Sequence, residues 1–422
     1  KSHKNFIEFI CIKENITVLS HSEDENKVVA NNDIKGRDKT QQLSIKAKER
    51  ENIGVLYKVK IPQNSAKYPW IAKQVAEDRL NYSYYSKYIR WLLPANFYGS
   101  LRPQISYSEE DVLFHDAGSR AGFFYHYSFD SGYNFTLQYE ATIDWKNEKK
   151  FLNLSELSNS SRRLSFVSLQ KNDIMLIAGK YWSAYYDIAK FTDHFMTFGA
   201  SASGAFNNSG DGAASGTGRA ENLVQVHLNK EDYSSTVQYQ SSHTNDGKEY
   251  DYGVAGSFIY TSWADIKLGA AVAVGNFSEI TPEMQFNGID GNDISIIGGV
   301  TYSRDKFMAN ALLSYSKNHM NDNEGHYFDA LGMEIYLRYD INNNIRIAGG
   351  TNILLANDNH YIGEFNIKRV ILSAQYTFRE RTFDDLFFIE ISIPKGRSAQ
   401  GESINKPIIA IGLRYKFNLL SF

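Results

Sequence analysis

From residue 95 onward, the chain consists of repeated segments of about ten residues in which apolar and polar side chains alternate. Such alternation is typical of β-strands whose two faces meet different surroundings. Clusters of Asn, Asp, Gly, Ser and Lys separate the segments, and no stretch with a helical period interrupts them. The pattern predicts an all-β fold with sixteen strands, at residues 95–107, 119–129, 133–145, 161–169, 173–181, 218–228, 233–241, 249–260, 263–275, 293–303, 306–317, 329–340, 344–355, 364–378, 383–394 and 406–417.

The connections between these segments alternate between short and long along the chain. The short ones are residues 130–132, 170–172, 229–232, 261–262, 304–305, 341–343 and 379–382. The long ones begin near residues 108, 146, 182, 242, 276, 318, 356 and 395. Tight turns on one side and long loops on the other are the layout of a bacterial outer-membrane barrel. The sequence therefore predicts a transmembrane, antiparallel, 16-stranded β-barrel.

The two faces of the predicted strands differ in chemistry. In the last strand, the odd-numbered residues from Ile409 to Phe417 are apolar, whereas Arg414 and Lys416 lie on the other face. A sheet in hydrocarbon must close on itself so that every backbone group is paired. The apolar face would then meet lipid, and the charged face would line the interior, because charged side chains need water. We expect a water-filled lumen.

Composition excludes several other classes of protein. The 45 Lys and Arg against 48 Asp and Glu leave no basic excess for binding nucleic acid. No apolar run is long enough for a helical membrane span. A single cysteine, Cys11, rules out an internal disulfide and a cysteine zinc cage, and the ten His residues show no zinc-site spacing. We therefore expect no metal, no cofactor and no catalytic residue.

The first 94 residues differ from the rest. Residues 20–51 are mostly polar and charged, which suits a solvated segment. Residues 68–93 place apolar side chains at helical spacing and end before Pro94, which predicts a helix. We expect residues 1–94 to be an N-terminal extension, residues 95–417 the barrel, and residues 418–422 a tail.

Several motifs in the barrel resemble those of the general, non-specific trimeric porins of Gram-negative outer membranes. The first strand reads Phe97-Tyr98-Gly99-Ser100-Leu101-Arg102, and later motifs are Ser119-Arg120-Ala121-Gly122-Phe123 and Arg163-Leu164-Ser165-Phe166. The most specific stretch runs from Gly179-Lys180 through Tyr186-Asp187 and Phe191-Thr192-Asp193 to Gly218-Arg219. The closing Tyr415-Lys416-Phe417 is similar to the aromatic signal that the family's barrel-insertion machinery reads.

The resemblance implies a third loop, at about residues 182–218, that folds inward and narrows the pore. It also implies a basic cluster on the wall facing acidic groups, which creates a field across the constriction. By motif, the basic residues are Arg102, Arg120, Arg163 and Arg219, and the acidic ones are Glu140 on the wall with Asp187 and Asp193 on the loop. Neutral Thr197 stands where the family carries a loop Glu, so we expect weakened cation preference or a slight anion preference.

The function expected on this basis is passive diffusion of ions and small hydrophilic solutes through an outer-membrane homotrimer. Its further partners would be outer-membrane lipid and lipopolysaccharide, with the insertion machinery during assembly. Two alternatives are a barrel that anchors residues 1–94 as a binding or adhesion module, and an outer-membrane hydrolase. An even number of strands leaves both barrel ends on the short-turn side, which predicts a periplasmic N-terminus.

Overall fold

The computed structural model divides the chain into two compact units, Lys1–Leu93 and Pro94–Phe422. In the second unit, it describes residues 95–109, 111–143, 162–206, 210–245, 248–263, 265–322, 324–356, 365–378 and 385–420. In the first unit, it describes six short strands: β1 (Ile7–Ile12), β2 (Asn15–Thr17), β3 (Leu19–His21), β4 (Val29–Ala30), β5 (Gln42–Ser44) and β6 (Tyr57–Val59). They form two small sheets, β2-β1-β6 and β4-β3-β5. The helix expected over residues 68–93 lies outside the described residues.

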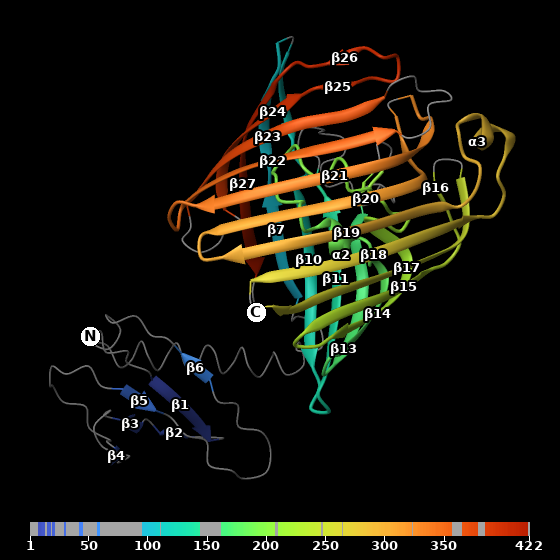
Figure 1. Ribbon diagram of the computed structural model, residues 1–422. Coiled ribbons are helices and arrows are strands. Elements are labelled where there is room, and N and C mark those ends of the chain that lie inside the picture. The colour runs from blue at the N-terminus through green and yellow to red at the C-terminus, as the bar shows by residue number, and fades with distance from the viewer. Residues whose placement is uncertain are drawn as a thin grey trace. The chain divides into compact units, whose positions relative to one another are not determined.

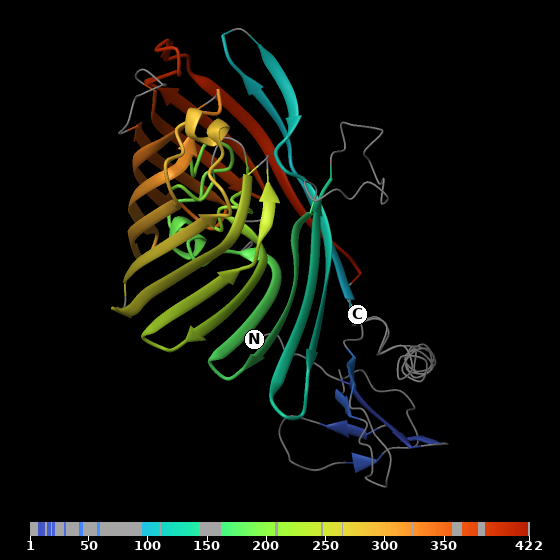
Figure 2. The same cartoon turned by 90° about the vertical axis from the view of Figure 1, so that its right-hand side faces the viewer.

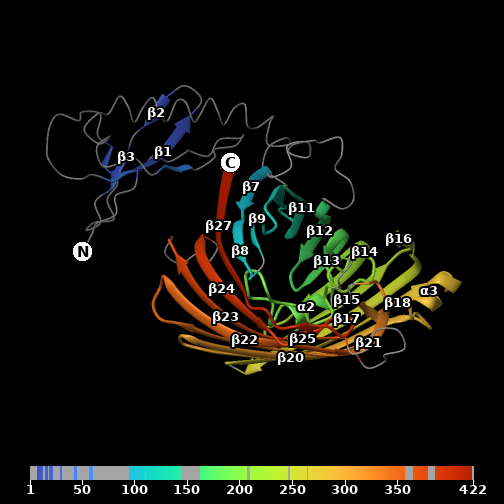
Figure 3. The same ribbon diagram turned by 90° about the horizontal axis from the view of Figure 1, so that it is seen from above.

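The second unit is a closed antiparallel barrel of sixteen strands (Figures 1 and 3). This confirms the strand number and fold class predicted from the alternation. In chain order, the strands are β7 (Ala95–Leu101), β10 (Arg120–Ser128), β11 (Tyr133–Thr142), β12 (Arg162–Lys171), β13 (Ile174–Trp182), β14 (Arg219–Asn229), β15 (Tyr233–Gln240), β17 (Lys248–Trp263), β18 (Ile266–Phe277), β19 (Asp293–Arg304), β20 (Phe307–Asn321), β21 (Tyr327–Asp340), β22 (Ile345–Ala356), β23 (Asn366–Thr377), β24 (Leu386–Pro394) and β27 (Ile408–Leu420).

Closure occurs where the first strand meets the last. Strand β7 pairs with β10 on one side and with β27 on the other, so the ring has no open edge at this seam. Leu420 lies opposite Phe97, and β27 therefore continues past Phe417, where the sequence pattern placed the end of the barrel. Residues 418–420 belong to the wall rather than to a separate tail.

Five short strands extend the wall at the end of the barrel that carries the long connections. They are β8 (Pro103–Tyr107), β9 (Val112–Asp116), β16 (His243–Asn245), β25 (Gly396–Arg397) and β26 (Ser403–Ile404). Strand β8 continues the first strand along β27, and β9 folds back on β8 as a hairpin that projects beyond β10 (Figure 2). The first connection, predicted as a long loop beginning at residue 108, therefore contains the paired strand β9.

Alternation along the strands matches the expected two faces. On β21, Leu337 is 44% exposed, whereas its neighbour Tyr336 is 1% exposed. On β27, Ile411 is 55% exposed and Ala410 is fully buried. Because register pairs apolar residues across neighbouring strands, as with Ile411 and Ile389, the outer surface is a continuous apolar band.

The interior is not uniformly polar. The chain between β13 and β14 enters the barrel and carries the short helix α2 (Tyr186–Ala189), which lies inside the ring (Figure 3). Ile188 and the neighbouring Tyr185 belong to a buried cluster with Ala271, Ile297 and Leu312 on β18, β19 and β20. Part of the inner wall is thus an apolar packing surface for this loop, while the wall elsewhere carries polar and charged side chains.

The described helices are short. Helix α2 has four residues, and α3 (Pro282–Phe286) has five, with Thr281 capping its N-terminus. In the part of the chain that the structure describes, none has the length and hydropathy needed to cross a membrane.

Candidate pore constriction

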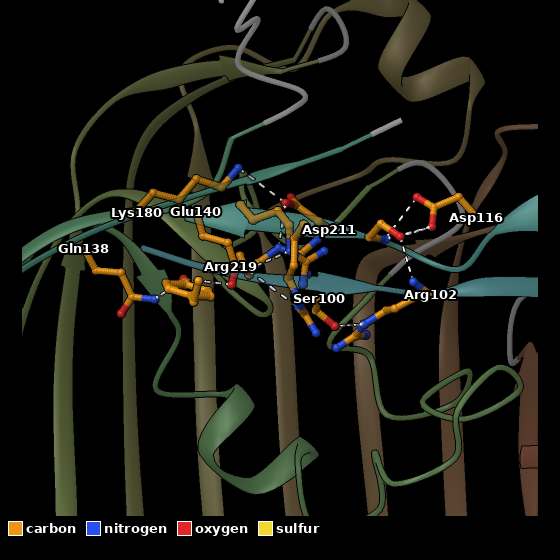
Figure 4. Close-up of polar contacts among 12 residues, drawn as sticks. Ser100, Arg102, Asp116, Gln138, Glu140, Lys180, Asp211 and Arg219 are labelled. Carbon is orange, nitrogen blue, oxygen red and sulfur yellow. Dashed lines mark hydrogen bonds and ion pairs between the residues drawn. The ribbon is translucent and has the colours of Figure 1, made fainter. Parts of the chain in front are cut away.

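Glu140 is the centre of a charged cluster on the inner wall. It lies on β11, and its Oε1 accepts from Nε of Arg163 on β12 at 2.9 Å and pairs with Nη1 of Arg120 on β10 at 3.6 Å. Its Oε2 accepts from the Tyr98 hydroxyl at 3.0 Å, and Gln138 donates to that same hydroxyl at 2.7 Å (Figure 4). The structure therefore brings together three residues that the motifs selected on three adjacent strands.

Arg219 pairs with a carboxylate that sequence reasoning missed. Its Nε lies 3.1 Å from Oδ2 of Asp211, on the returning arm of the inward loop. The same Oδ2 lies 3.3 Å from Nζ of Lys180, which also pairs with Glu221 at 3.7 Å (Figure 4). Asp211 therefore ties the loop to two wall cations and offsets part of their charge.

Lys180 was not predicted as a site residue, because the alternation along β13 places its side chain on the outer face of the barrel. Ala178 faces outward and is exposed, so alternation puts residue 180 outward as well. A register shift between Gly179 and Tyr181, with Gly179 at φ of 129°, turns the chain at this point. Lys180 is consequently buried beside the cluster, at 4% exposure.

Two further arginines lie near the seam of the barrel. The backbone N–H of Arg102 donates to Ser119 Oγ at 2.8 Å, and its side-chain Nε donates to Ser100 Oγ at 3.1 Å. Arg414 on β27 donates through Nη2 to the carbonyl of Met196 in the inward loop, at 3.2 Å. Sequence alternation put Arg414 on the inner face, but no motif marked it as a site residue.

Two wall carboxylates hold the inward loop in place. Glu390 on β24 accepts the backbone N–H groups of Met196 at 2.6 Å and Thr197 at 2.8 Å. Glu334 on β21 accepts from the Thr192 hydroxyl at 2.5 Å and from the backbone N–H of Ala202 at 2.7 Å. Both carboxylates are almost fully buried, so these bonds are charge-assisted and shielded from water.

Asp187 is placed differently from the expectation. Its carboxylate pairs with Lys190 on the same loop at 2.8 Å and accepts from the hydroxyls of Thr236 on β15 at 2.9 Å and Ser257 on β17 at 3.1 Å. The helix packs Asp187 against that wall, and no ion pair joins it to an arginine in the described residues. Predicted as an acidic group opposite the arginines, it instead fastens the loop to the β15–β17 side.

Asp193 lies on the inward loop, where its carboxylate accepts from the Tyr186 hydroxyl at 2.6 Å. Burial raises the pKa of the Tyr186 phenol, so this hydroxyl keeps its proton and donates. Neutral Thr197 donates to Oε1 of Gln104 on β8 at 2.8 Å. The loop thus reaches from β13 across the inner wall to β24, β27 and β8.

This arrangement can orient polar solutes but offers no metal cage. Within the described ranges, no group of three or more His, Cys, Asp or Glu side chains is arranged to hold a metal ion. Fixed guanidinium groups on one wall and loop carboxylates near them create a local field, which acts on ions and dipoles in water.

Comparison with solved structures places the barrel among known proteins. OmpF from Salmonella typhi superposes with a TM-score of 0.62 at 17% identity, covering 76% of this chain and 97% of that one. An anion-selective porin from Comamonas acidovorans gives 0.60 at 14% identity, covering 76% and 99%. OmpT of Vibrio cholerae, an outer-membrane protein in its trimer form, gives 0.56 at 14% identity, covering 76% and 99%. No family model matches the sequence, and no curated protein does. The second unit has the porin fold.

Proposed function

We propose that the chain forms a water-filled channel in the outer membrane, through which ions and small hydrophilic solutes diffuse passively. One observation carries the proposal: a closed ring of strands with an apolar exterior holds, inside it, a loop fastened by buried carboxylates beside a charged wall. A barrel whose interior served only to stabilise the fold would bury apolar side chains along its inner wall. Charged side chains on the inner wall are instead stabilised by water in the lumen.

The charges near the loop favour a slight anion preference. The ion pairs of this wall join five cationic side chains, Arg120, Arg162, Arg163, Lys180 and Arg219, to three carboxylates, those of Glu140, Asp211 and Glu221. Because excess fixed charge raises the local concentration of the opposite ion, chloride should pass somewhat more readily than potassium. The anion-selective Comamonas neighbour has the same fold.

We expect a homotrimer, since one neighbour is described in a trimer form. The N-terminus should lie on the periplasmic side, where an even-stranded barrel leaves both its ends. Lipopolysaccharide and lipid would contact the apolar band, and the insertion machinery would read the aromatic C-terminal strand.

Planar-bilayer recording tests the channel and its assembly together. Purified full-length protein should insert and conduct in steps that close at three levels, and a KCl gradient should give a reversal potential of the sign set by chloride. Strong cation selectivity would contradict the charge argument. Silence from protein that has demonstrably inserted would favour a second candidate, a barrel that anchors the separate unit Lys1–Leu93 as a binding module.

A further inference from the structure

Three aromatic rings gather where the inward loop leaves and rejoins the wall. Trp182 ends β13, Tyr186 begins α2, and Phe206 lies on the returning arm of the loop. The rings of Trp182 and Tyr186 stack at 4.0 Å between centroids with 17° between their planes. Phe206 lies 5.8 Å from Tyr186 and 6.5 Å from Trp182. We call Trp182, Tyr186 and Phe206 the ring cluster.

The ring cluster is only partly buried, unlike the packing surface beneath it. Tyr185, one residue before Tyr186, is fully buried among the apolar side chains of β18–β20. All three rings of the cluster keep some exposed surface. The hydrophobic effect favours removing exposed aromatic surface from water. In a water-filled channel, the apolar part of a solute would therefore bind favourably against the ring cluster.

A guanidinium group borders the ring cluster. Cζ of Arg219 lies 5.4 Å from the centroid of Trp182 and 5.9 Å from that of Phe206. Its Nε is bonded to Asp211. Among the described residues, the structure shows no hydrogen bond from its two terminal nitrogens. Arg219 therefore retains donors that a carboxylate can use in the paired geometry guanidinium favours.

We propose that the ring cluster and Arg219 form a binding station for planar solutes that carry an anionic group, such as aromatic carboxylates. The aromatic part of the solute lies against the ring cluster, and its carboxylate accepts from the terminal nitrogens of Arg219. This inference rests on the proposed channel function and deepens it, since it names a class of solute that the channel retains.

The surrounding charges favour an anionic over a cationic solute. Asp211 is paired with both Arg219 and Lys180, whereas Asp193 accepts from the Tyr186 hydroxyl and keeps its negative charge. Arg163 lies on the neighbouring wall with its Nε on Glu140, and adds to the positive potential. Because Arg219 and Arg163 together outweigh Asp193, we expect aromatic ammonium ions to be held less firmly than aromatic carboxylates.

Current blockade in planar bilayers tests the station with four probes of matched size or charge. Benzoate should reduce the KCl current of the full-length channel and increase its noise. It should do so at roughly a threefold to tenfold lower concentration than acetate, which is the ratio expected from one aromatic contact. Benzyl alcohol should act less than benzoate, and benzylammonium least. Equal effects of benzoate and acetate in a conducting channel would overturn the inference while leaving the channel function standing.

Two variants remove rings, and a third removes the guanidinium. Trp182→Leu and Phe206→Leu keep apolar bulk and should each move benzoate blockade toward the acetate value. Arg219→Gln should abolish the difference between benzoate and benzyl alcohol. The matched control is Trp263→Leu, because Trp263 lies on β17 at the short-turn end and is 52% exposed. Blockade by benzoate that is unchanged in both ring variants would contradict the assignment.

A second measurement does not depend on conduction. Saturation-transfer NMR with full-length protein in detergent should show benzoate ring signals that weaken in Trp182→Leu and in Phe206→Leu but persist in Trp263→Leu. If bilayers are silent yet this transfer is seen, the channel function fails and the station stands. If no transfer is seen with the unaltered chain, the station fails whatever the bilayers show.

Discussion

Single charges decide how firmly the loop is held, and Glu390 offers the cleanest test. Replacing Glu390 with Gln removes the charge that accepts the backbone N–H groups of Met196 and Thr197, and it places an amide N–H where an acceptor is needed. We expect a loss of about 1.5–3 kcal/mol in the free energy of unfolding and a noisier single-channel current, because the loop tip loosens. Chemical denaturation and bilayer recording measure both effects. The exposed Glu402→Gln provides the control, and equal behaviour of the two variants would contradict the anchoring role.

A variant of Glu140 tests how the charge of the inner wall affects ion selectivity, rather than how the loop is anchored. Glu140→Gln keeps an acceptor for Tyr98 but leaves Arg120 and Arg163 without their shared carboxylate. We expect the reversal potential in a KCl gradient to move toward the chloride value, because the net positive charge at the wall rises by one. Glu231→Gln, at an exposed short turn, should leave it unchanged. A shift toward potassium would refute the assigned polarity.

At the residue scale, the position of a side chain could be predicted where the strand period and a family motif agree. Arg120, Arg163 and Glu140 lie on regular strands, so alternation and motif place them on one wall. The contacts of Asp187 could not be predicted, because the packing of α2 on the far wall, which no local pattern records, sets the direction of its side chain. Asp211 was missed because it lies in a Gly, Ala, Ser and Asn-rich run without periodicity.

At the scale of elements, the loop depends on glycine to approach the wall. A Cβ on Gly332 of β21 would lie 1.8 Å from the carbonyl oxygen of Ala202 and 2.3 Å from Ser314 Oγ, so the loop backbone sits directly on this strand. This close approach could not be read from sequence, where Gly332 is one of many strand glycines.

Gly332→Ala should therefore displace the loop without opening the barrel. We expect changed single-channel conductance and a lower unfolding temperature, since the new methyl group forces the Ala202 segment away and weakens its bond to Glu334. Heat-modified gel mobility should still report a closed barrel. Gly298→Ala is the matched control, because a Cβ there meets nothing closer than 3.9 Å. Identical currents from the two variants would show that the loop does not set the conductance.

For the whole molecule, the barrel could be predicted from the sequence pattern, but the path of the loop inside it could not. Each spanning strand carries its own period-2 signal, and the need to pair every backbone group in lipid forces sixteen such strands to close. The path of the inward loop depends on contacts from Thr192 to Glu334 and from Met196 to Glu390, which join residues 142 and 194 positions apart. Such distant pairings have no local signature, and only the family resemblance indicated the loop.

Because the ring of strands closes through β7 and β27 alone, the barrel does not need the first unit to complete its hydrogen bonding. A chain that begins at Pro94, fused to an export signal, should therefore insert and conduct with the same reversal potential as the full-length protein. Bilayer recording of the two proteins side by side makes the comparison, with urea-refolded samples of each to separate folding from export. A truncated chain that refolds into a heat-modifiable barrel but conducts differently would assign the first unit a part in permeation, and one that cannot close would show that residues before Pro94 help to assemble the seam.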